Sequence, residues 1–129
     1  MKKFIVLTIV LAAMALILAA CGGPVALNFE ASDEFQFTPS NTSVSAGDEV
    51  DVTLTNPGAL EHAWALVPND VDVATVTEAD AISGANISSV AAGETGTVTF
   101  TAPEAGTYKF VCTIPGHAVA GMVGTLTVN

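Results

Sequence analysis

Positive charge is scarce in this sequence of 129 residues. Its three basic residues are Lys2, Lys3 and Lys109, against 13 acidic ones, all of which follow position 21. From residue 21 onward one lysine therefore accompanies 13 acids, a formal charge of −12. Proteins that bind nucleic acid or adhere electrostatically to anionic lipid need lysine and arginine, so the composition argues against both classes. The charge instead favours a soluble domain that attracts partners with a basic face.

The sequence has one long uncharged run, Phe4–Ala20, directly behind Lys2 and Lys3. A positive start followed by an apolar stretch is typical of a secretion signal. The run is slightly shorter than the roughly 20 residues that span a bilayer, although an uncleaved membrane anchor is the alternative. Leu18–Cys21 resembles a bacterial lipobox, whose cysteine is acylated and becomes the new N-terminus. The resemblance implies a signal peptide over 1–20 and lipidation at Cys21 within a linker, 21–24. It also implies export, with a lipid anchor on the outer face of a bacterial membrane, in the periplasm or at the cell surface.

Short β-strands are predicted between residue 25 and the C-terminus. Val50, Val52 and Leu54 alternate with polar residues, and the same period of two recurs near Phe100, Phe110 and Leu126. Glycine and proline turns separate these segments. The pattern predicts one all-β domain over 25–129, an antiparallel Greek-key sandwich or barrel, which we expect to be a monomer. Between residues 70 and 89 the pattern is irregular, and Thr77 with Asp80 is typical of a cap that begins a short helix.

Few residues in the predicted domain carry an imidazole or a sulfur atom. They are His62, Cys112, His117 and Met122. Cys112 ends a predicted strand with its side chain toward the core, and Met122 opens the next strand. His117 lies on the loop between them, after a Pro-Gly turn, and His62 starts another strand. We therefore expect all four side chains at one end of the sandwich.

Two imidazoles, one thiolate and a weak thioether form the ligand set of a blue-copper electron-transfer centre. Each residue alone has an ordinary structural explanation, such as a core cysteine or a core methionine, but the set together predicts one type 1 copper. Zinc is the chemical alternative for a Cys/His cluster, although a structural zinc site uses further Cys or His in place of Met.

The Cys112-x4-His117-x4-Met122 loop, with His62 upstream, resembles the cupredoxin family. Its spacing is similar to that of the auracyanin and azurin branches rather than the plastocyanin branch. The segments Ala46–Asp48, His62–Val67 and Gly121–Leu126 also match the family. The resemblance implies one-electron transfer with redox proteins such as cytochromes or membrane electron-transfer complexes. One position departs from it, because Ala63 stands where the family usually has an asparagine that braces the copper loop.

An enzyme is not expected. Related copper enzymes need further copper centres built from additional histidines, and a hydrolase needs a free histidine as base. The sequence holds only His62 and His117, and the predicted centre uses both. A copper-binding or delivery module without redox turnover is the alternative. For electron transfer, the exposed edge of His117 is the expected exit, within an apolar patch of Pro115, Ala118 and Val119 with Ala59 and Leu60.

Overall fold

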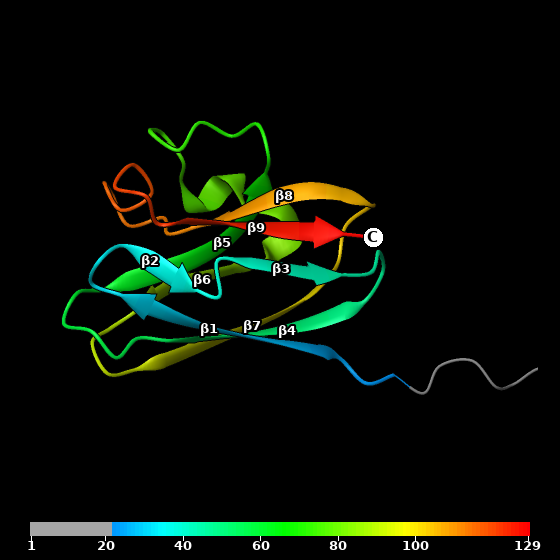
Figure 1. Cartoon of the computed structure of the whole chain (residues 1–129), viewed down its shortest axis with the longest axis horizontal. Coiled ribbons are helices and arrows are strands. Elements are labelled where there is room, and N and C mark those ends of the chain that lie inside the picture. The colour runs from blue at the N-terminus through cyan, green and yellow to red at the C-terminus, as the bar shows by residue number, and fades with distance from the viewer. Residues whose placement is uncertain (1–21) are drawn as a thin grey trace, which may run out of the picture.

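A computed structural model describes residues 22–129, which form a sandwich of two β-sheets with almost no helix (Figure 1). One sheet has the strand order β2-β1-β4-β7 and the other has the order β3-β9-β8-β5-β6. The elements, in chain order, are β1 (Val25–Ser32), β2 (Gln36–Thr38), β3 (Asn41–Val44), β4 (Glu49–Thr55), β5 (His62–Pro68), η1 (Glu78–Asp80), η2 (Ile82–Gly84), β6 (Asn86–Val90), β7 (Thr95–Thr101), β8 (Gly106–Val111) and β9 (Val123–Val128). The all-β prediction is confirmed.

The predicted signal peptide 1–20 and the predicted lipidation site Cys21 lie outside the described residues. Over the range 22–129, no helix is both long and apolar enough to cross a bilayer.

Both sheets mix parallel and antiparallel pairs. β1 pairs with β4 and β3 pairs with β9 in parallel, whereas the remaining pairs are antiparallel. Parallel neighbours cannot be joined by a tight hairpin, so the chain must make a crossover between them. Between β1 and β4 it does so by passing through β3 in the opposite sheet. The sandwich therefore contains two parallel contacts that strand alternation alone does not predict.

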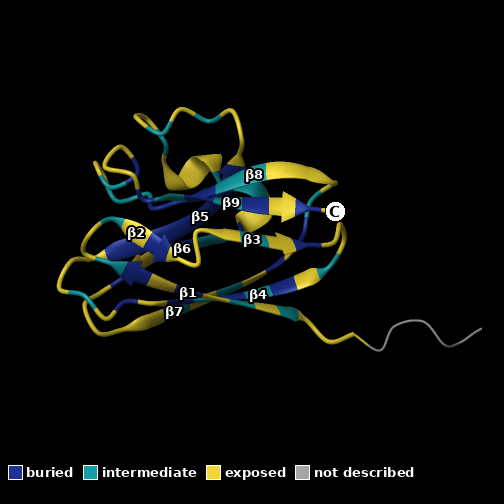
Figure 2. Cartoon of the chain, in the orientation of Figure 1, coloured by how far each residue is buried: buried dark blue, intermediate teal, exposed yellow. Residues whose placement is uncertain are grey.

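Strand β4 shows the expected alternation, since Val50, Val52 and Leu54 are buried between half-buried or exposed polar residues. Strand β5 differs, because every residue from His62 to Val67 is buried (Figure 2). The segment between β5 and β6 packs Val71, Val73 and Val76 against the face that would otherwise be open. Strand β5 is therefore covered on both faces, and its first residue, His62, is already buried.

The segment between β5 and β6 contains only short 3₁₀ turns. The predicted capping contact is present, because the Thr77 backbone N–H donates to Asp80 Oδ2 at 2.8 Å. Glu78–Asp80 forms a single 3₁₀ turn rather than an α-helix, since Ala81 leaves it in an extended conformation. The Lys109 ammonium donates to the Val71 carbonyl at 3.3 Å and ties this segment to β8.

An aromatic cluster fills the core next to the ends of β5 and β8. Phe110 lies 4.7 Å from Phe29, 5.5 Å from Phe37 and 6.0 Å from Trp64, measured between ring centroids. Gly124 lies opposite Phe110 in the β8–β9 register, and a Cβ there would collide with the Phe110 ring. Phe110 and Trp64 are each two residues from a predicted metal ligand. The packed rings therefore give the candidate site a rigid base.

Candidate metal centre

The β8–β9 loop carries three of the four predicted site residues and is closed by its own backbone. Pro115 and Gly116 occupy the central positions of a turn in which the His117 N–H donates to the Ile114 carbonyl at 3.1 Å. Gly116 has φ +88°, the left-handed conformation that a type II turn requires there. The Met122 N–H donates to the His117 carbonyl at 3.0 Å, and the Cys112 N–H donates to the Met122 carbonyl at 3.1 Å. These bonds hold the Cys112, His117 and Met122 backbones together.

His62 reaches the same place from the other side, as the first residue of β5. One donor atom from each of His62, Cys112 and His117 lies within 4.8 Å of the other two. Cys112 Sγ is 3.5 Å from His117 Nδ1, and the two imidazole centroids are 5.2 Å apart. The prediction that these side chains converge at one end of the sandwich agrees with this geometry.

The four predicted ligands are not equally buried. His62, Cys112 and Met122 are fully buried, whereas His117 is half-buried. Burial raises the pKa of the Cys112 thiol. Burial, and next to it the neighbouring His62, lower the pKa of His117. The pocket therefore disfavours a free thiolate and a free imidazolium, and a bound cation would compensate the thiolate.

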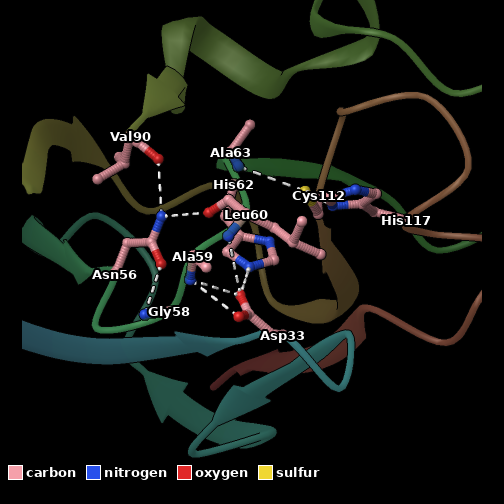
Figure 3. Close-up of polar contacts among 10 residues, drawn as sticks. All are labelled: Asp33, Asn56, Gly58, Ala59, Leu60, His62, Ala63, Val90, Cys112 and His117. Atoms are coloured by element: carbon pink, nitrogen blue, oxygen red, sulfur yellow. Dashed lines mark hydrogen bonds and ion pairs between the residues drawn. The ribbon is translucent and has the colours of Figure 1, made fainter. Parts of the chain in front are cut away.

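The donor set fits a copper ion. Both ring nitrogens of His62 are buried without a hydrogen-bond partner, so the imidazole is free to bind a metal. The Ala63 backbone N–H donates a hydrogen bond to Cys112 Sγ at 3.3 Å and would stabilise negative charge on the sulfur (Figure 3). Thiolate and imidazole together suit copper in both of its oxidation states. The backbone contact at position 63 is thus retained, although alanine supplies no side-chain brace.

Two polar residues that the sequence did not single out support the loop before His62. Asn56 is fully buried, and its amide donates to the carbonyls of Leu60 at 2.7 Å and Val90 at 2.9 Å. Its side-chain oxygen accepts from the Gly58 N–H at 3.1 Å. In the sequence Asn56 belongs to an Asn-Pro-Gly turn, and nothing local indicates the contact with Val90.

Asp33, in the turn after β1, is the second of these residues. Its carboxylate accepts from the Ala59 N–H at 2.8 Å and from the Leu60 N–H at 3.1 Å. These two backbone hydrogen bonds, that of Ala59 foremost, lower the pKa of Asp33. Asp33 Oδ1 also lies 3.5 Å from His62 Nε2. Asp33 therefore joins the β1–β2 turn to the loop that delivers His62.

Phe35, in the same turn, contacts the other imidazole. Its ring lies edge-on to His117 with a centroid separation of 4.8 Å. The residue has φ 58°, an unusual conformation for a bulky side chain, and its N–H donates to the Ser32 carbonyl at 3.1 Å. One turn thus contacts both histidines of the cluster.

The predicted apolar patch beside His117 is wrong at one position. Leu60 and Val119 are 42% and 62% exposed, and Ala59 and Pro115 are exposed as well. Ala118 is buried instead, because it packs inward with the cluster formed by β5, β8 and the segment after β5. The exposed apolar surface of the two loops that carry His62 and His117 consequently comes from the other four predicted residues.

Comparison with known proteins agrees with this geometry. A family model described as copper binding proteins of the plastocyanin/azurin family matches residues 24–129. Auracyanin-A of Chloroflexus aurantiacus is 36% identical over 152 aligned positions, covering 93% of each chain. Auracyanin-B of the same organism is also 36% identical, over 77% of this chain and 49% of its own length.

Solved structures show the same likeness. The structure of auracyanin A from Chloroflexus aurantiacus, described as a "blue" copper protein, superposes with a TM-score of 0.72 at 32% identity. The alignment covers 83% of this chain and 100% of that one. Reduced auracyanin from Roseiflexus castenholzii gives a TM-score of 0.71 at 27% identity, over 84% of this chain and 99% of that one.

Proposed function

The chain belongs to the plastocyanin/azurin family of copper-binding proteins, the cupredoxins, and from this premise we propose that it is an electron carrier with four specific copper ligands. Its cofactor is one type 1 copper. The proposed ligands are His62, Cys112, His117 and Met122. The observation that carries the proposal is the convergence of the first three donors within 4.8 Å, from separate parts of the chain.

Each ligand has a distinct proposed role. When bound, a type 1 copper supplies one-electron chemistry by alternating between Cu(II) and Cu(I). Cys112 provides the thiolate, and the Ala63 N–H stabilises the negative charge on its sulfur. His62 and His117 would provide imidazole nitrogens, and Met122 would provide a weak thioether ligand. Because the aromatic core and the closed loop fix these side chains, little rearrangement accompanies electron transfer.

His117 is the proposed exit for the electron. It is the one ligand candidate that is half-buried rather than fully buried, and the exposed Leu60 and Val119 lie on the loops around it. Redox encounters bury little surface and dissociate quickly, which suits a small apolar contact. The acidic body would attract a redox partner with a basic face, such as a cytochrome or a membrane electron-transfer complex.

The test is the visible spectrum of the copper(II)-loaded domain. The wild-type domain should show an intense thiolate-to-copper band, and Cys112→Ser should lose it. The neighbouring substitution Thr113→Ser should keep it. Fluorescence of Trp64, the single tryptophan, establishes that each variant is folded. A band that persists in folded Cys112→Ser would refute the ligand assignment.

A copper-delivery module is the competing function. Delivery sites need access, whereas three of the four proposed ligands are fully buried. Both histidines of the sequence belong to the proposed centre, which leaves none for acid–base catalysis. The reduced protein should pass an electron to an oxidised acceptor and retain its copper. Transfer of copper to an apo-acceptor without a change of oxidation state would favour delivery instead.

We further propose a tripartite organisation, with a signal peptide at 1–20, a linker at 21–24 that begins with acylated Cys21, and a copper domain at 25–129. The protein would then be exported and held by lipid on the outer face of a bacterial membrane. The arrangement of the domain supports a tether, because the described chain enters at the end opposite the β8–β9 loop (Figure 1). Mass spectrometry of the membrane fraction should find lipid on Cys21, and Cys21→Ser should release the protein. An unmodified Cys21 in the mature protein would refute the anchor.

A further inference from the structure

The contact between Asp33 and His62 separates the two nitrogens of the imidazole. Nε2 faces Asp33 Oδ1 at 3.5 Å, and this leaves Nδ1 as the nitrogen that can face Cys112 and His117 (Figure 3). Histidine that binds a metal is commonly oriented by a carboxylate or carbonyl at its other nitrogen, which fixes the tautomer and the ring plane. Asp33 occupies that position here.

The carboxylate itself is held in place. Oδ1 accepts from the N–H groups of Ala59 and Leu60 at 3.1 Å each, and Oδ2 accepts from Ala59 at 2.8 Å. Two backbone donors thus fix its position relative to the segment that leads into His62. The carboxylate is 39% exposed, whereas the imidazole it faces is fully buried. The partly exposed Asp33 carboxylate therefore places its negative charge next to the buried imidazole of His62.

Asp33 supports the segment before His62, whereas the alanine at position 63 contacts the thiol through its backbone N–H alone. A side-chain brace of the copper loop from position 63 is absent, and Asp33 supports a different segment, the loop before His62, from the opposite sheet. Gly58 lies against the same carboxylate, where a Cβ would collide with the Asp33 side chain. The loop composition therefore permits the close approach of Asp33 to the backbone of residues 58–60.

We infer that Asp33 is a positioning residue for the copper centre: its carboxylate, with Oδ1 3.5 Å from His62 Nε2, keeps Nδ1 directed at the metal and adds negative charge that favours Cu(II) over Cu(I). The inference rests on the proposed function, because it requires His62 to be a copper ligand. It goes beyond that function by assigning control of the reduction potential to a residue that touches neither the metal nor the thiolate.

The experiment compares Asp33→Asn with Glu34→Gln in the copper-loaded protein. Glu34 is the adjacent exposed acid, so both variants lose one negative charge, but Glu34 has no hydrogen bond to another residue within 22–129. Asp33→Asn should reduce the preference for Cu(II) over Cu(I) roughly tenfold. This corresponds to a rise in reduction potential of about 59 mV for one electron. Glu34→Gln should shift the potential by less than half of that, since solvent and salt screen an exposed charge.

Equal shifts in the two variants would overturn the inference. Wild-type protein without the thiolate-to-copper band would instead overturn the proposed function, so the two failures are distinguishable. A measurement on the unsubstituted copper(I) protein decides the matter if Asp33→Asn does not fold. Nitrogen-15 NMR should find a slowly exchanging proton on His62 Nε2 and the metal on Nδ1. Metal on Nε2, or a rapidly exchanging Nε2 proton, would overturn the inference.

Discussion

Replacing Asn56 with alanine removes three hydrogen bonds from the buried base of the β4–β5 loop. The amide of Asn56 bonds Leu60 and Val90, and its oxygen bonds the Gly58 N–H. A hydrogen bond of this kind contributes about 0.5–1.5 kcal/mol net to stability. Asn56→Ala should therefore lower the free energy of unfolding by about 3 kcal/mol. For a domain of this size the midpoint temperature should fall by about 12 °C, at roughly 4 °C per kcal/mol.

The assay is denaturant unfolding of the metal-free domain, followed by the fluorescence of Trp64. Asn28→Ala is the matched control, because Asn28 is exposed on β1 and makes no side-chain hydrogen bond within the described chain. The control should change stability by no more than about 0.5 kcal/mol. A loss below about 1 kcal/mol in Asn56→Ala would refute the argument that this side chain supports the loop.

Three further predictions concern packing, metal uptake and association. Gly124→Ala should cost roughly 1–3 kcal/mol in thermal melts, because its Cβ would collide with Phe110 and lie 2.8 Å from the Ser40 carbonyl. Gly106→Ala, which has no such contact, should be nearly neutral, and equal costs would contradict the packing argument. Since burial raises the pKa of Cys112, the metal-free thiol is protonated at neutral pH, and copper uptake should release about one proton. Calorimetry of copper binding in two buffers of different ionisation enthalpy should detect this proton. Release of the same number of protons when Cys112→Ser binds copper would contradict the assignment of the proton to the thiol. The rate of electron transfer with a basic partner should fall as ionic strength rises, and a flat profile would exclude electrostatic steering.

The sequence was sufficient for the fold class and for the grouping of the candidate donors. Strand alternation is a local property, so the inward direction of Val52 or Cys112 follows from its neighbours along the chain. The loop from Cys112 to Met122 is short, and its turn residues restrict where His117 lies. These features depend on few contacts that are distant in sequence, which is why they could be predicted.

The supporting residues could not be found in this way. Asn56 meets Val90 across 34 positions, and Asp33 meets Leu60 across 27. The Asp33 contact needs β1 and β4 to become parallel neighbours, and the Asn56 contact needs the end of β4 to lie beside the end of β6; no local pattern specifies either arrangement. Ala118 was misplaced for a similar reason, because a small apolar residue on a loop shows no direction until the segment after β5 covers it.

Strand β1 has a consequence for the height at which the protein operates. It runs from Val25, four residues after the proposed lipidation site in the sequence, to Ser32, beside the turn that touches both imidazoles. Seven steps of about 3.3 Å give it a length of about 23 Å. In an upright tethered molecule the strand acts as a fixed spacer, and the electron leaves roughly that far above the lipid surface. In the proposed lipid-anchored form, a membrane partner would therefore need to project its own redox group beyond the headgroups to meet it.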